Sequence, residues 1–239
     1  MALLEAHGDD IPLDAAAACL AAEEQPDLDP DSVLASLDAL AAGVRLAPGA
    51  PLADTLARIN HHLFTQLGFT GDRQTYDDPV NSFLDRVLAR RKGLPILLSL
   101  VYIEVARRLG LDFVGIGFPS HFLIRHRDSD FFLDPFTDGR ILRPAQLQVW
   151  LGRLYPRAVI DEAVLQRATA PVTNRRLMLR VNHNLKASYL RRENLPGAIR
   201  TSERLLLLDE ESTDERKMLG QMLLAVGRRE EGLAELAHY

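Results

Sequence analysis

Residues 81–139 read NSFLDRVLARRKGLPILLSLVYIEVARRLGLDFVGIGFPSHFLIRHRDSDFFLDPFTDG, and this stretch decides the fold. Apolar residues at helical spacing predict a helix over residues 81–91. The sequence GLP at residues 93–95 ends it and opens a second helix, because proline suits a first helical turn. The second helix, residues 96–109, is apolar almost all round, which predicts a buried helix. Its fourteen residues are too few to span a bilayer, and Gly110 ends it.

Strands are predicted after the second helix. Residues 113–118 and 121–126 are rich in β-branched and aromatic side chains. The sequence RDSD at residues 127–130 is a turn signal, and residues 131–134 return as a further strand. The stretch therefore predicts two helices followed by an antiparallel hairpin.

The hairpin turn predicts a register. It places His126 opposite Phe131 and Leu123 opposite Asp134. Residues opposite each other share a face of the sheet, and so do residues two apart in one strand. We therefore expect His121 and Asp134 on one face as diagonal neighbours, whereas a slip of one residue would put them on opposite faces. An imidazole beside a carboxylate is the orienting pair of many nucleophilic sites.

The order of these elements resembles the transglutaminase-like pattern, which is related to papain-like folds. In such enzymes a nucleophilic Cys stands at the start of a buried helix, where the helix dipole favours the thiolate. A strand His and a strand Asp complete the pattern, and His121 and Asp134 match them. Pro95 stands where the resemblance places the Cys, and proline has no nucleophilic atom. The nearest hydroxyl is that of Ser99, one turn into the helix, which we expect to be buried and bonded to the carbonyl of Pro95.

A closer resemblance covers almost the whole chain. The strings that carry it are FTGDRQTYDDPVNSFLDRVLARRKGLPILLS, FPSHFLIR, LDPF and NLKASYLRR. They resemble the bacterial family named for the invasion regulator SirB, whose own pattern carries a proline at this helix start. The resemblance implies an α+β, predominantly helical protein. It has a transglutaminase-like (papain-like) core with a small antiparallel sheet, followed by helical hairpins like those of tetratricopeptide repeats (TPR).

Composition narrows the class of protein. The chain has 239 residues, 47% of them hydrophobic, enough for one large domain or two small ones. A net charge of −5 gives no general attraction to nucleic acid or to an anionic membrane. No apolar run is long enough for a membrane span, and the start lacks the features of a signal peptide, so we expect a cytoplasmic protein. The single cysteine, Cys19, excludes an intramolecular disulfide and is expected to be a small core residue of a helix.

The flanking sequence is helical. Three helices are predicted between residues 9 and 68. Residues 69–79 are predicted to form a polar loop, a rim for the surface that carries His121 and Asp134. Further helices are predicted over residues 144–154, 160–167, 174–192 and 196–208. Residues 168–174 are predicted to be a boundary or linker, with Asn174 as the N-cap of the helix that follows.

The tail shows a faint repeat. Residues 191–206 overlay the chain from Ala225 onward with an offset of 34, the TPR period, so that Ala198 matches Gly232. Small residues at such positions let paired helices approach closely. Only about one and a half repeats fit, whereas such stacks usually need about three.

The predicted division follows from this repeat. Residues 1–170 are expected to form the transglutaminase-like domain with its N-terminal helical region. Residues 171–239 are expected to form a TPR-like helical tail that packs on this domain or continues through a partner.

The sequence leaves three functions open. The favoured one is a non-catalytic protein, a pseudoenzyme, that binds a protein partner through the TPR-like tail and has a role in regulation. The second is a hydrolase or acyl-transfer enzyme in which Asp134 orients His121 as base and Ser99 or a water is the nucleophile. The third is a small-ligand or peptide binder that uses His121, Asp134 and Asn81 in the remnant cleft.

Each candidate residue also has a structural interpretation. His121 and Asp134 are explained equally by a hydrogen bond that joins two strands, and Asn81 by a helix cap or a loop-bonding role. His61 and His62 are adjacent on a helix and point in different directions. No spacing matches a zinc or calcium motif and no Gly-rich phosphate loop is present, so we expect no metal and no cofactor. The basic clusters lie at helix ends, and we expect no direct binding of nucleic acid.

Overall fold

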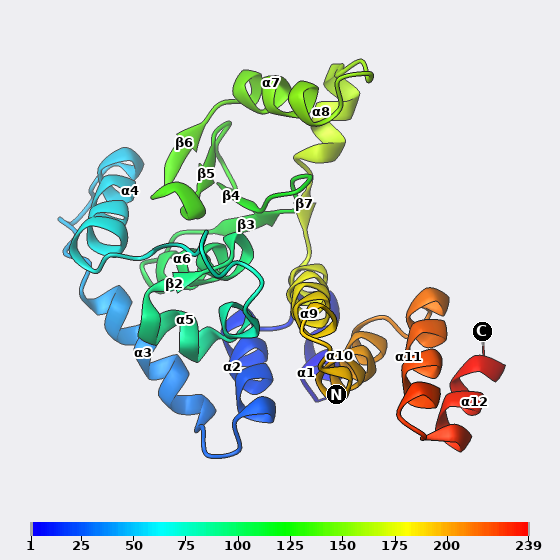
Figure 1. The fold of residues 1–239 in the computed structure, drawn as a ribbon. Coiled ribbons are helices and arrows are strands. Elements are labelled where there is room, and N and C mark those ends of the chain that lie inside the picture. The colour runs from blue at the N-terminus through cyan, green and yellow to red at the C-terminus, as the bar shows by residue number, and fades with distance from the viewer. Residues whose placement is uncertain (1, 239) are drawn as a thin grey trace.

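The computed structural model describes residues 2–238 (Figure 1). Its first part is helical. In chain order it contains α1 (Ala2–His7), the 3-10 turn η1 (Gly8–Asp10), α2 (Leu13–Glu24), α3 (Pro30–Ala42), α4 (Leu52–Asn60) and the short π-helix η2 (His61–Gln66). Helices α2, α3 and α4 are the three helices predicted between residues 9 and 68. The helix α1 was not predicted.

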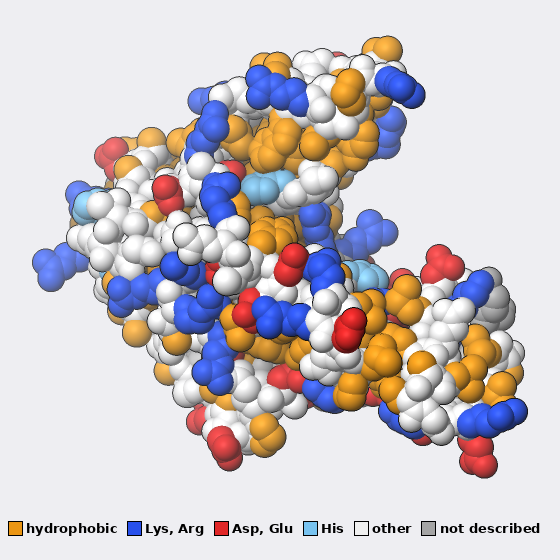
Figure 2. Space-filling model, in the orientation of Figure 1, with side chains coloured by type: hydrophobic (Ala, Val, Ile, Leu, Met, Phe, Trp, Pro, Cys, Tyr) orange, Lys and Arg blue, Asp and Glu red, His pale blue; other side chains and the backbone are white. Residues whose placement is uncertain are grey.

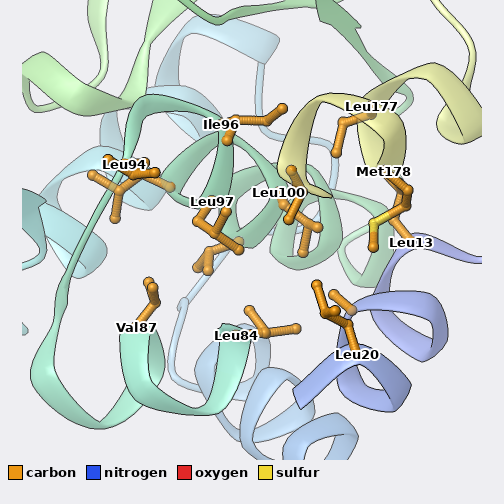
Figure 3. Packing of buried hydrophobic residues seen from close by; sticks show 14 of the residues in the cluster. Leu13, Leu20, Leu84, Val87, Leu94, Ile96, Leu97, Leu100, Leu177 and Met178 are labelled. Atoms are coloured by element: carbon orange, nitrogen blue, oxygen red, sulfur yellow. The ribbon is translucent and has the colours of Figure 1, made fainter. Parts of the chain in front are cut away.

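The buried helix α6 is the centre of the core. The central elements are β1 (Thr70–Gly71), η3 (Pro79–Ser82), α5 (Leu84–Arg90), β2 (Lys92–Gly93) and α6 (Pro95–Arg108). As predicted, Pro95 lies in the first turn of α6, Gly110 follows its end with φ +80°, and residues 95–106 are buried. Figure 3 shows side chains of α6 packed with those of α2, α5 and α9 in one cluster. The predicted loop at residues 69–79 contains β1, which pairs in parallel with β2.

A five-stranded antiparallel sheet lies beside α6. Its strands are β3 (Phe113–Ile116), β4 (Leu123–His126), β5 (Phe132–Asp134), β6 (Arg140–Leu142) and β7 (Pro171–Val172), in the order β6-β5-β4-β3-β7. The 3-10 turn η4 (Pro135–Thr137) links β5 and β6. Ile124 pairs with Leu133, which is the predicted hairpin register. The fold is therefore α+β and predominantly helical, as predicted.

The sheet contains one strand that was not predicted and one that begins later than predicted. The predicted linker at residues 168–174 contains β7, an edge strand that pairs with β3, where Pro171 is tolerated because an edge needs no donor on its outer side. The strand predicted over residues 121–126 begins only at Leu123. Ser120 has φ +58°, a turn conformation that no strand residue adopts, so His121 lies in the turn before β4.

An arm formed by α7 (Pro144–Leu154) and α8 (Glu162–Ala168) covers the face of the sheet opposite α6 (Figure 1). It encloses a second, smaller apolar cluster. The sheet, the loop after β3 and α7 contribute Ile116, Phe118, Leu123, Phe132, Leu142, Leu147 and Leu151 to this cluster. The helix predicted over residues 144–154 is α7, and α8 begins two residues later than predicted.

The chain ends in four helices, α9 (Asn174–Arg191), α10 (Leu195–Leu208), α11 (Thr213–Ala225) and α12 (Arg229–Ala237). Helix α9 contacts α2, α6, η1 and η3, so the tail packs on the rest of the chain. Thr173, not Asn174, caps α9, and the Asn174 amide instead donates to the carbonyl of Ile11 at 2.9 Å. A Cβ on Gly232 would lie 2.9 Å from the carbonyl oxygen of Gly220, the close helix approach that the repeat predicted.

The prediction for Cys19 is wrong. Its side chain is exposed, because the buried face of α2 carries Ala17, Ala18, Leu20 and Ala21 instead. Within residues 2–238, every helix is too short or too polar to span a bilayer.

Candidate functional site

His121 and Asp134 are in contact. Nε2 of His121 lies 2.8 Å from Oδ1 of Asp134. Asp134 ends β5, and the same oxygen accepts a hydrogen bond from the backbone N–H of Phe136 at 3.1 Å, which caps η4. Because a carboxylate only accepts, Nε2 carries the hydrogen and donates it. The juxtaposition that the hairpin register predicted is therefore present, although His121 comes from a turn and not from a strand.

Aromatic rings enclose the imidazole. The ring of Phe136 meets it edge to face with centroids 5.8 Å apart, and the ring of Trp150, on α7, lies 5.0 Å away. The side chains of His121 and Asp134 are 11% and 6% exposed. Nδ1 of His121 has no hydrogen bond to any residue that the structure describes. The pair is thus held in a mostly apolar setting with one ring nitrogen left unbonded.

Arg180 fixes the turn that carries His121. Arg180 lies on α9, and its Nη2 donates to the carbonyl oxygen of His121 at 2.7 Å. Both Nη1 and Nη2 also lie 3.4 Å from the carbonyl oxygen of Phe118. Its guanidinium also lies over the ring of Phe122, and burial lowers the pKa of Arg180. Sequence reasoning missed this residue and Trp150. Spacing gave no signal for Arg180, because the buried face of α9 also carries the polar residues Asn182 and Lys186.

The loop before η3 borders the site, as predicted. The guanidinium of Arg73 lies 4.8 Å from the ring centroid of Phe136, and the ring of Tyr76 meets Phe136 at 6.4 Å. Burial raises the pKa of Tyr76. Since Phe136 contacts His121, this loop forms one rim of the site.

Asn81 shapes that loop. Its side chain is wholly buried, its amide donates to the carbonyl of Thr75 at 2.6 Å, and its Oδ1 accepts from Arg90 at 3.0 Å. No contact joins it to His121 or Asp134 among the described residues. The loop-bonding interpretation of Asn81 accounts for every polar atom of its side chain.

A groove opens beside Asp134. It has a volume of about 380 Å³ and lies between α7 and the segment from β5 to β6. Its walls are Asp134, Thr137, Arg140, Leu142, Gln146, Val149, Trp150, Arg153 and Leu154. Figure 2 shows a different hollow in the molecular surface, between the α7–α8 arm and the C-terminal helices, with hydrophobic side chains and a histidine on its wall. A ligand in the groove would touch both Asp134 and Trp150, whose ring packs on His121.

Comparison with known proteins identifies the family. The model of the transglutaminase-like superfamily matches residues 31–182. The chain belongs to the transglutaminase-like superfamily. It is similar to a UPF0162 protein of Xylella fastidiosa (strain Temecula1), with 34% identity over 235 residues, 96% of this chain and 83% of the relative. The family match covers the sheet, α6 and the first half of α9.

Two further relatives are more distant. UPF0162 protein YchA of Escherichia coli (strain K12) is 28% identical over 193 residues, 79% of this chain and 70% of the relative. F-box only protein 21 of Homo sapiens is 30% identical over 147 residues, 57% of this chain and 23% of the relative. No solved structure matches the chain significantly.

Pro95, which the sequence predicted at the position of the nucleophile, lies at the start of α6. Ser99, one turn later, is wholly buried, and its hydroxyl has no hydrogen-bond partner in the described part of the chain. The predicted hydrogen bond from Ser99 to the carbonyl of Pro95 is therefore wrong. Helix α6 does contact η4, the turn that follows Asp134. Cys19 lies elsewhere, on α2, beside Leu3 and Leu207.

Metal-ligating side chains do not gather in residues 2–238, where no three His, Cys, Asp or Glu side chains form a group that could hold an ion. His62 pairs with Gln66 instead, with Nδ1 3.0 Å from Oε1. The site is thus a His–Asp pair with aromatic walls and a neighbouring groove.

Proposed function

We propose that this transglutaminase-like protein is non-catalytic and acts by binding other proteins. The observation that supports the proposal is Pro95 in the first turn of α6, the position that the transglutaminase-like resemblance assigns to the nucleophilic Cys. The substitute hydroxyl of Ser99 is wholly buried in the same helix, out of reach of a substrate. The bond between His121 and Asp134 then serves to join the turn before β4 to the end of β5.

The proposed partner surface is the helical tail, α9 to α12. Helical hairpins stacked side by side typically present extended binding surfaces, and TPR-like hairpins are an example. Large apolar side chains are exposed on this tail at Leu190, Leu207, Met218, Leu224, Val226 and Leu233. The resemblance to the SirB-type family supports a role in regulation.

Surface variants of the full chain test this proposal, because α9 belongs to the core and cannot be deleted safely. We expect Met218→Glu with Leu233→Glu to lose partners that the wild type captures by cross-linking in its own lysate. Ala35→Glu, on the exposed face of α3, is the matched control and should retain them. An identical set of partners for all three proteins would contradict binding through the tail.

A second candidate, a hydrolase that activates water, is favoured by the free Nδ1 of His121. With Nε2 held by Asp134, the other nitrogen is a basic site, which is the arrangement of a general base. A panel of ester, amide and peptide substrates tests it against His121→Ala and Ser99→Ala. Turnover lost in His121→Ala at an unchanged melting temperature would establish the hydrolase and refute the non-catalytic proposal. Since Ser99 is buried, Ser99→Ala should leave such turnover intact.

A third candidate is a peptide or small-ligand binder in the remnant cleft. The groove beside Asp134 supports this candidate, because its walls carry both charged and apolar side chains that a ligand could contact.

A further inference from the structure

We propose that the groove between β6 and α7 binds an acidic polypeptide segment that also carries apolar side chains. This inference rests on the proposed protein-binding function and names a second surface, away from the tail. The groove has a volume of about 380 Å³, room for a few side chains of a bound segment.

Uncompensated positive charge marks the groove. Arg140 and Arg153 line it, are exposed, and form no ion pair with any described residue. Arg143, between them in sequence, is by contrast paired with Asp130 at 2.7 Å. The carboxylate of Asp134 also lines the groove, but it forms no ion pair with Arg140 or Arg153, and its Oδ1 accepts from His121 and from a backbone N–H.

The segment from β6 to the end of the arm is basic on an acidic chain. Residues 140–170 contain five arginines and two acidic residues, whereas the chain has a net charge of −5. Both acidic side chains have local partners: Asp161 accepts the backbone N–H of Val164 at 2.8 Å, and Glu162 accepts from Gln166 at 3.2 Å. An acidic segment would therefore be attracted to this arm and repelled by much of the remaining surface.

Exposed apolar side chains complete the surface. Val149, in the groove wall, is 56% exposed, and Val159, between α7 and α8, is 84% exposed. Tyr155, directly after α7, is about half exposed. The two valines suit the apolar side chains of a peptide. Single-stranded nucleic acid is bound by stacking on aromatic faces, whereas Trp150, in the groove wall, packs against His121 and Phe118. The combination of charge and aliphatic surface points to an amphipathic acidic peptide.

A defined probe tests the inference on the full chain. The probe is a fluorescein-labelled twelve-residue peptide that repeats Glu-Glu-Leu-Phe three times, and its affinity is measured by fluorescence anisotropy. We expect Arg140→Glu with Arg153→Glu to weaken binding at least about ten-fold, because two attractive contacts become repulsive. Val149→Ser should weaken it less, about three-fold, through lost apolar contact. The matched control is Arg176→Glu with Arg229→Glu, two exposed arginines at other sites, and should bind as the wild type does.

Two further probes separate the alternatives. Replacement of every Glu by Gln, or every Leu and Phe by Ser, should each abolish binding if charge and apolar contact both matter. Tighter binding of a labelled oligothymidylate or of phosphatidylserine vesicles than of the peptide would overturn the inference, as would equal losses in the groove and control variants. The tail variant, Met218→Glu with Leu233→Glu, should bind the probe normally. If the tail variant alone loses lysate partners and the wild type does not bind the peptide, the tail proposal stands. The proposed binding of an acidic segment in the groove is then refuted.

Discussion

Arg90 Nη2 donates a hydrogen bond to Oδ2 of Asp72 at 3.0 Å and so joins the end of α5 to the loop that borders the site. The same carboxylate accepts the backbone N–H of Thr75 at 2.8 Å and its hydroxyl at 2.6 Å. Arg90 also donates to Asn81. This set of bonds fixes the loop that carries Arg73 and Tyr76, and the rim of the site depends on one ionised carboxylate.

Replacing Asp72 by Asn should destabilise the protein by about 2 kcal/mol at pH 7. Burial raises the pKa of Asp72, but the hydrogen bonds from Thr75 and Arg90 outweigh burial and lower this pKa from 3.8 to about 2. A lowered pKa contributes stability that is full well above 3.8 and is lost as the pH falls towards about 2. Urea unfolding of both proteins should show the difference roughly halved at about pH 3.

The control for this prediction is Asp27→Asn. Asp27 is exposed, so its replacement should change the free energy of unfolding by less than about 0.5 kcal/mol at either pH. A difference between wild type and Asp72→Asn that did not vary with pH would show that the charge of Asp72 is not the source of the stability.

A methyl group at residue 71 should disturb the site. A Cβ on Gly71 would lie 2.4 Å from Cε2 of Phe136, whose ring is confined by Arg73, Tyr76 and His121. We expect Gly71→Ala to cost about 1–3 kcal/mol, because the ring must move. It should also shift the ¹H–¹⁵N resonances of the His121 ring in NMR spectra. Gly152→Ala, in α7 with open space around it, should be neutral or slightly stabilising.

The sequence predicted the hairpin register because the turn at residues 127–130 and the alternation of side chains constrain each other. That register brought His121 and Asp134 together correctly. The register could not show that His121 lies in a turn. The positive φ of Ser120 cannot be predicted from a stretch that is rich in aromatic residues. The edge strand β7 escaped prediction for another reason: two residues carry no periodicity.

The surroundings of the site could not be predicted. Arg180 contacts His121 across 59 positions of sequence, and Trp150 reaches it from a different helix. Such contacts arise from tertiary packing, which hydrophobic spacing does not encode. The position of Cys19 shows the same limit on a smaller scale. In an Ala-rich helix with little contrast between its faces, spacing does not decide which small residue points outward.

Glu24 should anchor the tail to α2. Its Oε1 accepts from Arg204 at 2.7 Å, and its Oε2 accepts from Arg200 at 2.6 Å and from the Tyr189 hydroxyl at 3.2 Å. We expect Glu24→Gln to cost about 2 kcal/mol, because Arg204 loses the buried one of its two charged partners. Hydrogen exchange of α10 should become faster in that variant.

Glu23→Gln is the matched control for this anchor. Glu23 also pairs with Arg204, at 2.7 Å, but is 56% exposed, and its loss should cost less than about 1 kcal/mol. Burial raises the pKa of Glu24. The hydrogen bond from Arg200 and the charges of Arg200 and Arg204 outweigh burial, so the pKa of Glu24 is lowered. Its contribution is therefore present above its ordinary pKa of 4.5 and is lost as the pH falls below that value. Equal losses of stability in Glu23→Gln and Glu24→Gln would show that exposure does not determine how much each ion pair contributes.

Lys186 and Glu215 should show a strong mutual dependence. Nζ of Lys186 lies 2.5 Å from Oε2 of Glu215, which joins α9 to α11, and the two side chains are 8% and 5% exposed. Lys186→Met alone should cost about 3 kcal/mol, because it leaves a buried carboxylate without its partner, and Glu215→Leu alone should cost a similar amount. The double variant should recover most of the stability, since apolar side chains can fill the site without desolvated charge. Chemical unfolding of all four proteins gives the coupling energy, and a double variant as unstable as the sum of the single variants would refute this view of the pair.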